Sequence, residues 1–197
     1  MPKASFPPLS VSRPSLLSNR SDAGFRRLLY DLFSLAAILE MARREFARRI
    51  GIAPSQYSMI RLVAERHRHG GITVTEITNT LQMHNSFVVL QTGSLVKKGI
   101  LTRTPNPRDK RSVLLRLSKK GEELVTATAP AAVLVNDFFF GWMGKKDVER
   151  FSATVAKLVE QGPAALDTLR SALRSSAGRP RNIKDTARRV SDKSAGI

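Results

Sequence analysis

The sequence has no cysteine among its 197 residues, and this absence excludes disulfide bonds, thiolate metal sites and thiol redox sensing. Histidine is also scarce, and two of the three residues, His67 and His69, stand two positions apart, so a helix would place them on different faces. Glycine-rich phosphate loops, nucleophile elbows and paired catalytic carboxylates are missing as well. We therefore expect neither a metal ion nor another cofactor, and we expect that the protein is not an enzyme.

Long apolar runs are missing too. No uninterrupted stretch of 18 apolar residues occurs, and the N-terminal residues lack the apolar segment of a signal peptide. These absences predict a soluble, cytoplasmic protein without a membrane partner.

Acidic residues are few relative to basic ones. The chain has 16 aspartates and glutamates against 33 lysines and arginines, which gives a formal net charge of +17. The excess is concentrated between Lys97 and Lys120, where nine basic residues accompany a single acidic residue, Asp109. Such a surface favours a polyanionic partner, because each lysine or arginine placed on a phosphate releases condensed counterions.

Apolar periodicity and turn residues predict a mainly α-helical chain with one small β-hairpin. We expect five parts along the sequence. They are a Pro- and Ser-rich disordered lead (1–20), an N-terminal dimerisation helix (21–52), a winged helix-turn-helix (53–118), C-terminal linker and dimerisation helices (119–175) and a basic disordered tail (176–197).

Two helices with apolar stripes are expected to pair with a second subunit. The first runs from residue 21 or 22 to about Arg49 with a heptad seam, although an ordinary core helix is the alternative. The second begins at Asp147, and Gly162 and Pro163 should interrupt it and begin a further helix to about Ala172. The residues expected at the dimer interface are Leu28, Leu32, Leu35, Phe151, Val155 and Leu158.

The central segment carries the signals of a helix-turn-helix followed by a hairpin. Thr73 and Glu76 form a capping box at the start of a short helix, and a second helix begins near Asn85. Two short strands then flank the basic turn within residues 100–117, and Ser118 caps the next helix. A helix that can lie in a groove beside a positively charged ribbon is the architecture of a DNA-reading protein.

Three motifs in this region carry a family resemblance. They are Leu95-Val96-Lys97-Lys98-Gly99-Ile100-Leu101, Arg108-Asp109-Lys110-Arg111-Ser112 and Leu117-Ser118-Lys119-Lys120-Gly121. On these residues the chain resembles the MarR family of bacterial transcription regulators, over roughly residues 25–160. The resemblance implies a homodimer, with the terminal helices at its interface, that binds a pseudo-palindromic operator in double-stranded DNA and acts as a repressor. Many relatives release DNA when a small, often aromatic, anion binds between the two regions, so the resemblance also implies a small aromatic or anionic effector.

The resemblance assigns roles to individual residues. Arg111 looks like the arginine that enters the minor groove, with Arg108 beside it, and Asp109 looks like the residue that holds the wing. The residues expected to meet base edges in the major groove are Asn85, Ser86, Val89 and Gln91. The residues expected on phosphates are His84, Lys97, Lys98, Arg103, Lys110 and Lys119. A cytoplasmic protein of this kind is associated with the nucleoid when it is bound to DNA.

The recognition helix departs from the family pattern at two positions. Leu90 stands where relatives have an arginine, and Gly93 stands where they have an acidic residue. In one explanation the apolar side chains contact thymine methyl groups; in the other the helix is rotated, so that Leu90 packs and Gln91 reads adenine. The inward positions, counted by helical spacing from Leu95, are Val88, Gln91 and Thr92.

Two other functions stay open on the sequence alone. The apolar recognition helix and the basic tails also suit a nonspecific architectural DNA-binding protein. A winged-helix module that binds an acidic protein partner and does not read DNA is the other alternative.

Overall fold

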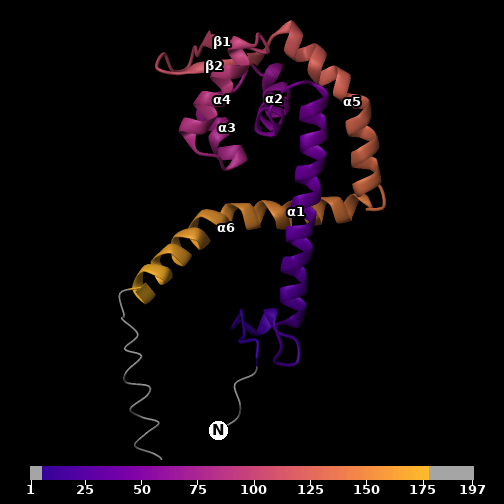
Figure 1. Cartoon of the computed structure of the whole chain (residues 1–197), viewed down its shortest axis with the longest axis vertical. Coiled ribbons are helices and arrows are strands. Elements are labelled where there is room, and N and C mark those ends of the chain that lie inside the picture. The colour runs from indigo at the N-terminus through magenta and orange to yellow at the C-terminus, as the bar shows by residue number, and fades with distance from the viewer. Residues whose placement is uncertain (1–5, 178–197) are drawn as a thin grey trace, which may run out of the picture. The chain divides into compact units, whose positions relative to one another are not determined.

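The computed structural model describes residues 6–177, so the predicted basic tail lies outside the described residues from position 178 on. Six α-helices and one antiparallel hairpin make up most of this part of the chain (Figure 1). The elements are the 3-10 helix η1 (Pro14–Leu16), α1 (Ala23–Arg49), α2 (Pro54–His67), α3 (Val74–Leu81), α4 (Asn85–Lys97), β1 (Leu101–Pro105), β2 (Val113–Leu117), α5 (Lys119–Phe140) and α6 (Lys145–Ala177). The predicted class, mainly α-helical with a small β-hairpin, is confirmed.

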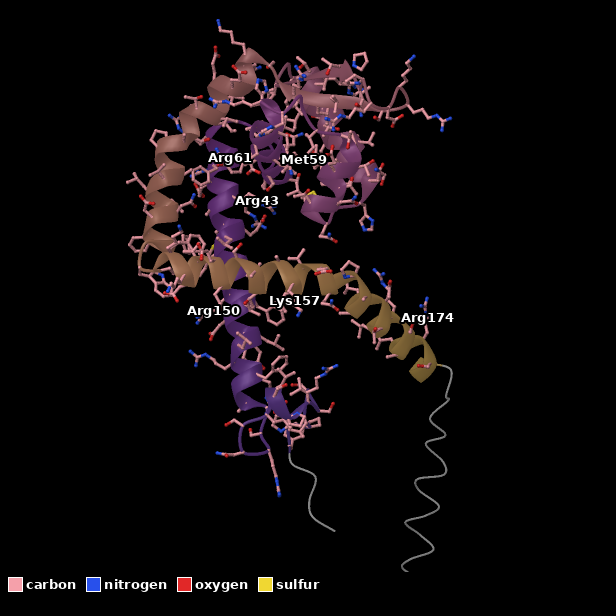
Figure 2. All side chains as sticks on the ribbon, turned by 180° about the vertical axis from the view of Figure 1, so that it is seen from behind. Arg43, Met59, Arg61, Arg150, Lys157 and Arg174 are labelled. Atoms are coloured by element: carbon pink, nitrogen blue, oxygen red, sulfur yellow. The ribbon has the colours of Figure 1, made fainter. Side chains whose placement is uncertain are left out.

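The N-terminal unit, Met1–Val133, contains the winged helix-turn-helix. Its core is built from α2, α3, α4 and the hairpin, and Met59 of α2 is fully buried in it (Figure 2). Burial of these side chains is the main favourable term that holds α4 and the hairpin in place. The other core residues that position them include Ile60, Val63, Ile77, Val88, Leu95, Leu101, Leu115 and Leu117.

The hairpin is fastened to the helices by a third extended segment. Ile72 exchanges two backbone hydrogen bonds with Leu115 of β2, at 3.1 and 2.8 Å. Gly71 permits this pairing, because a Cβ there would lie 2.7 Å from the carbonyl oxygen of Leu115. The paired residues of β1 and β2 run from Leu101↔Leu117 to Pro105↔Val113.

Both predicted helix caps, one before α3 and one before α5, are present. Thr73 Oγ1 accepts a hydrogen bond from the Glu76 amide at 3.2 Å, and Glu76 Oε2 accepts one from the Thr73 amide at 2.8 Å. The Thr73 amide, and after it the Thr73 hydroxyl, lower the pKa of the Glu76 carboxyl below its ordinary value. Ser118 Oγ accepts from the Gly121 amide at 3.1 Å and so caps α5. A side chain at Gly121 would overlap the carbonyl oxygen of Ile100, so this close approach requires glycine.

The N-terminal lead differs from its predicted disorder. Ser10 donates from its amide and its hydroxyl to Oδ2 of Asp22, at 2.7 and 2.6 Å. Arg26 Nη2 lies 2.7 Å from Oδ1 of the same carboxylate, which is fully buried. The hydrogen bond from the Ser10 hydroxyl, followed by that from its amide, lowers the pKa of Asp22. The structure therefore corrects the predicted disorder for residues 6–20, because a buried carboxylate holds this segment against the start of α1.

The C-terminal unit, Leu134–Ile197, contains the end of α5 and the whole of α6. The break predicted at Gly162 and Pro163 is wrong, since α6 continues through Pro163. Proline removes one backbone hydrogen bond, and the turns on either side continue with a bend, of the kind that α6 shows in Figure 1. No residue between 145 and 175 is buried. Side chains such as Arg150, Lys157 and Arg174 project from this helix (Figure 2).

Helix α5 is long and apolar enough, by length and composition alone, to cross a membrane, with a mean hydropathy of 1.2 over its best 18-residue window. This level does not conflict with the absence of an uninterrupted run of 18 apolar residues, because averaging over a window tolerates the polar residues between shorter apolar runs. The same composition is typical of a helix that packs against protein. Phe138 and Trp142, at the end of α5 and just after it, are 89% and 79% exposed. These side chains therefore form a surface that needs a cover.

Candidate nucleic-acid interface

Helix α4 turns one side toward the core and the other toward solvent. Val88, Thr92 and Leu95 are fully buried, and the Thr92 hydroxyl donates to the Val88 carbonyl at 2.8 Å. On the opposite side Val89 and Leu90 are 47% and 67% exposed. The buried contacts set the rotation of the helix about its axis, as the spacing from Leu95 predicted, and they define which side is available to a partner.

The explanation by a rotated helix is wrong, because Leu90 is exposed and does not pack into the core. Gln91 lies on the flank of α4 that faces α2, and its side-chain carbonyl accepts from the Gln56 amide at 3.0 Å. Gln56 itself is only 4% exposed. Base reading by Gln91 would therefore require this partly buried link to break, whereas Asn85 and Ser86 are exposed at the start of the helix.

Gly93 brings an arginine of the hairpin against α4. Arg103 extends from β1, and its Nη2 would lie 3.7 Å from a Cβ placed on Gly93. The guanidinium of Arg103 makes no hydrogen bond or ion pair with any residue that the structure describes. An acidic residue at position 93, which the family pattern leads one to expect, would pair with this guanidinium; glycine leaves its positive charge available to a partner.

The turn between β1 and β2 presents its basic side chains outward. Short polar side chains hold its backbone: Asp109 Oδ1 accepts from the Arg111 amide at 3.0 Å, and Asn106 Oδ1 accepts from the Arg108 amide at 3.0 Å. Asp109 thus makes the kind of contact that a residue holding the wing requires. The side chains of Arg108, Lys110 and Arg111 are exposed, and none has an ion-pair partner within residues 6–175.

The residues expected on phosphates lie at both ends of α4, along the hairpin and at the first position of α5. His84 precedes α4 in the capping position, but its side chain makes no capping hydrogen bond. Lys120, which was not among the residues expected on phosphates, donates to the Lys98 carbonyl at 3.0 Å. All six residues of this set are exposed: His84, Lys97, Lys98, Arg103, Lys110 and Lys119.

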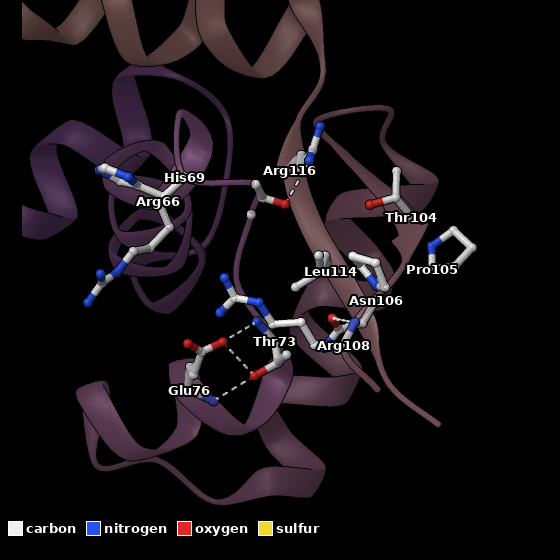
Figure 3. A pocket seen from close by; sticks show the side chains of 13 residues that line it. Arg66, His69, Thr73, Glu76, Thr104, Pro105, Asn106, Arg108, Leu114 and Arg116 are labelled. Carbon is white, nitrogen blue, oxygen red and sulfur yellow. Dashed lines mark hydrogen bonds between the residues drawn. The ribbon is translucent and has the colours of Figure 1, made fainter. Parts of the chain in front are cut away.

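A basic pocket, missed by the sequence analysis, opens where the end of α2, the start of α3 and the hairpin meet (Figure 3). Its volume is about 910 Å³, and Glu76 is the one carboxylate in its lining. Arg116 crosses from β2 and donates from Nε to the Gly70 carbonyl at 2.8 Å. The lining includes the basic residues Arg66, His69, Arg108 and Arg116. They come from segments far apart in the sequence, so no local motif could have brought them together.

The described residues offer contact chemistry rather than reaction chemistry. Within residues 6–177 no group of three or more His, Asp or Glu side chains lies close enough to hold a metal ion. The chain presents instead an exposed helix, a set of cations without acidic partners and a turn held by its own hydrogen bonds. These are the features of a surface that binds a polyanion through its charge and its shape.

Comparison with known proteins agrees with the interpretation of this surface as one that binds a polyanion. The MarR family profile matches residues 52–113, from just before α2 to the first residue of β2. The HTH-type transcriptional regulator YdcH of Bacillus subtilis (strain 168) is 30% identical over 118 residues, which cover 56% of this chain and 80% of YdcH. The HTH-type transcriptional repressor MdtR of the same organism is 28% identical over 100 residues, which cover 49% of this chain and 63% of MdtR.

A solved structure shows the same fold. CouR from Rhodococcus jostii RHA1, bound to p-coumaroyl-CoA, matches with a TM-score of 0.62 at 19% identity, covering 71% of this chain and 96% of CouR. The identity to YdcH over most of that protein's length adds a sequence relationship to the shared fold. Members of this family are transcription regulators rather than enzymes. The chain therefore belongs to the MarR family, and it is a DNA-binding transcription regulator.

Proposed function

We propose that the protein is a homodimeric repressor that binds a pseudo-palindromic operator sequence-specifically and releases it when a small effector binds. The observation that carries this proposal is the exposed side of α4 beside an arginine-rich turn, with both elements held on one buried core. Two copies of such a unit suit two half-sites, because a two-fold symmetric protein matches a two-fold symmetric DNA sequence.

In each half-site, α4 lies in the major groove and the turn of the hairpin lies in the adjacent minor groove. Asn85 and Ser86 at the start of α4 are exposed and able to hydrogen-bond base edges. The guanidinium of Arg111 suits a narrow minor groove, where the negative potential is strongest. Lys97 in the last turn of α4 and Lys98 just after it rest on phosphates.

The homodimer is supported by apolar surface that the single chain leaves uncovered. On α1, Leu28 is 52% exposed, and Leu32 and Leu35 are partly exposed. On α6, Phe151 and Leu158 are 39% and 57% exposed. Helix α6 has an apolar stripe and no buried residue between 145 and 175, and such a helix gains little stability in water by itself. We therefore assign a second copy of the chain as the cover of these apolar surfaces.

Repression and effector release are supported by the relatives. MdtR is named a transcriptional repressor, and the CouR structure contains p-coumaroyl-CoA. We extend to this chain a repressor role and a small aromatic or anionic effector. A repressor of this kind works in the cytoplasm, on the nucleoid while it is bound to DNA.

A nonspecific architectural DNA-binding protein is the second candidate, and one observation favours it. Between Asn85 and Val96, α4 has no lysine or arginine that can read guanine. Phosphate contacts from the hairpin and the ends of α4 would then supply the binding energy for any sequence.

Footprinting of the full-length protein on genomic DNA, followed by competition at fixed salt, separates these functions. A specific regulator prefers its own sites over bulk DNA by at least roughly 1,000-fold. An architectural protein shows no such preference, and a protein-interaction module shifts no DNA fragment. Sedimentation equilibrium tests the dimer in the same preparation, and a monomer at micromolar concentration would contradict the symmetric half-site arrangement.

A further inference from the structure

The exposed side of α4 is apolar at positions where a DNA-reading helix ordinarily carries hydrogen-bonding side chains. Residues three and four apart share a helix face, so Ser86, Val89 and Leu90 form one surface, which Gly93 continues without a side chain. Val89 and Leu90 are 47% and 67% exposed. The buried residues on the opposite side hold this surface outward, so it is what α4 offers to the floor of a groove.

Base edges in the major groove offer such a surface one apolar partner, the 5-methyl group of thymine. Guanine presents two acceptors, which call for an arginine or a lysine that this part of α4 lacks. Adenine calls for an asparagine or glutamine, and the Gln91 carbonyl is already bonded to Gln56. A leucine side chain over a guanine or cytosine edge would remove water from polar groups without replacing their hydrogen bonds.

We propose that Val89 and Leu90 read thymine methyl groups, so that each operator half-site carries thymines at the base pairs beneath the middle of α4. This inference rests on the proposed insertion of α4 into the major groove. The cations around this surface favour DNA over an apolar protein as its partner. Lys97, Lys98 and Arg103 are exposed without acidic partners among the described residues. An apolar protein partner would bury those charges unpaired, whereas DNA supplies a phosphate for each.

The test begins with selection of binding sites from a random double-stranded DNA library by the full-length protein. Thymines at fixed positions in the enriched half-sites are expected. Each thymine is then replaced by uracil, which lacks the methyl group and keeps every hydrogen-bonding atom of the edge. Affinity is expected to fall about fourfold for each contacted methyl group, and about 15-fold for a pair, from the free energy of burying a methyl-sized group.

Variants of α4 locate the contact. Leu90→Ala is expected to weaken binding to the thymine site and to bring the thymine-to-uracil affinity ratio at one position close to 1. Phe87→Ala is the control: Phe87 is also apolar and 39% exposed, but it lies at one edge of this surface, about 60° round the helix from Leu90 and about 160° from Val89. That variant is expected to keep the full thymine-to-uracil ratio, whatever its effect on overall affinity.

Each outcome bears on one of the two claims. Enriched half-sites without thymine, or uracil sites that bind within twofold of thymine sites at every position, overturn methyl reading and leave the DNA-reading function standing. An unchanged thymine-to-uracil ratio in Leu90→Ala, together with a ratio that is lost in Phe87→Ala, overturns the assignment of the residues. Failure to enrich any sequence overturns the proposed sequence-specific function, and methyl reading with it.

Discussion

The hairpin turn and the recognition helix of this protein present opposite chemistries to DNA. The turn, residues 106–112, carries three exposed basic side chains, whereas α4 is uncharged from Asn85 to Val96. Charges act on the phosphates of any sequence, but a contact with a base edge depends on which base is present. The turn is therefore expected to determine how tightly the protein binds, and α4 is expected to determine where it binds.

The two regions also differ in how they are held. Helix α4 packs on the core through fully buried residues such as Val88 and Leu95. The turn is held by local hydrogen bonds in which the side-chain oxygens of Asn106 and Asp109 accept from the backbone amides two residues further on. Substitutions of exposed side chains in the turn therefore leave the core unchanged, so they test charge without altering the position of α4.

The largest effect is expected from Arg111→Ala. Loss of a minor-groove arginine removes about 1–3 kcal/mol of binding free energy, so the Kd for the operator should rise about 5- to 150-fold. Lys110→Ala is the matched control in the same turn. It is expected to cost far less, and to lower the slope of log K against log salt by about one unit. Equal losses in the two variants, measured by fluorescence anisotropy across a salt series, would contradict a special role for Arg111.

A smaller effect is expected from Gly93→Asp, which places a carboxylate beside the guanidinium of Arg103. The new ion pair neutralises a charge that DNA otherwise uses, and the carboxylate also faces phosphates, so affinity should fall about tenfold at low salt. Gly93→Asn has the same shape without the charge and isolates the electrostatic part. If the aspartate and asparagine variants bind DNA alike, Arg103 takes no part in binding.

Much of the scaffold behind this comparison could be predicted, because it depends on local patterns. The capping box at Thr73 and Glu76, the bounds of α1 and the buried side of α4 all follow from residues within one or two helical turns of each other. The apolar exposed side of α4 could be predicted from the sequence for the same reason. The sequence could not decide whether these apolar side chains contact thymine methyl groups or whether the helix is rotated, because that depends on whether Leu90 finds a packing partner elsewhere in the fold.

The features that the sequence did not predict are contacts between distant residues. The hydrogen bond from Gln56 to Gln91 joins positions 35 apart, and the Ser10 hydroxyl reaches an aspartate 12 residues away. His67 likewise has its Nε2 at 2.9 Å from Oε1 of Glu122 in α5. Such pairs leave no periodic signal, because each needs the completed fold to bring the two side chains together.

A still smaller effect on DNA binding is expected from Lys97→Gln at the end of α4. Removal of one phosphate contact should weaken binding a few-fold for all sequences and should lower the salt slope by about one unit. Because Lys97 contacts no base in the proposed complex, the thymine-to-uracil affinity ratio should stay unchanged. Titrations of thymine and uracil operators at several salt concentrations check both statements, and a changed ratio would show that charge and base reading are not separate in α4.

The smallest effect on DNA binding is expected from Glu76→Gln, which alters the support of the helix-turn-helix and none of the contacts proposed with bases. The Thr73 amide and hydroxyl lower the pKa of Glu76, so the ionised carboxylate stabilises the folded state at neutral pH. That contribution is present above the pKa of the unfolded chain and is lost as the pH falls through the lower pKa of the folded state. The variant should be less stable than the natural chain by less than about 1 kcal/mol near neutral pH, because the group is solvent-exposed.

Urea unfolding of the two proteins across the acid range checks the sign of this contribution. The difference in unfolding free energy should shrink toward zero as the carboxylate becomes protonated, while affinity for the operator at neutral pH stays unchanged. Glu123→Gln is the matched control, since the Glu123 side chain is exposed and makes no hydrogen bond or ion pair among the described residues. A difference that persists undiminished in acid would mean that the cap depends on the shape of the side chain rather than on its charge. An altered operator affinity would instead mean that the start of α3 contacts DNA. DNA binding would then involve three regions: the charged turn, the apolar recognition helix and the start of α3.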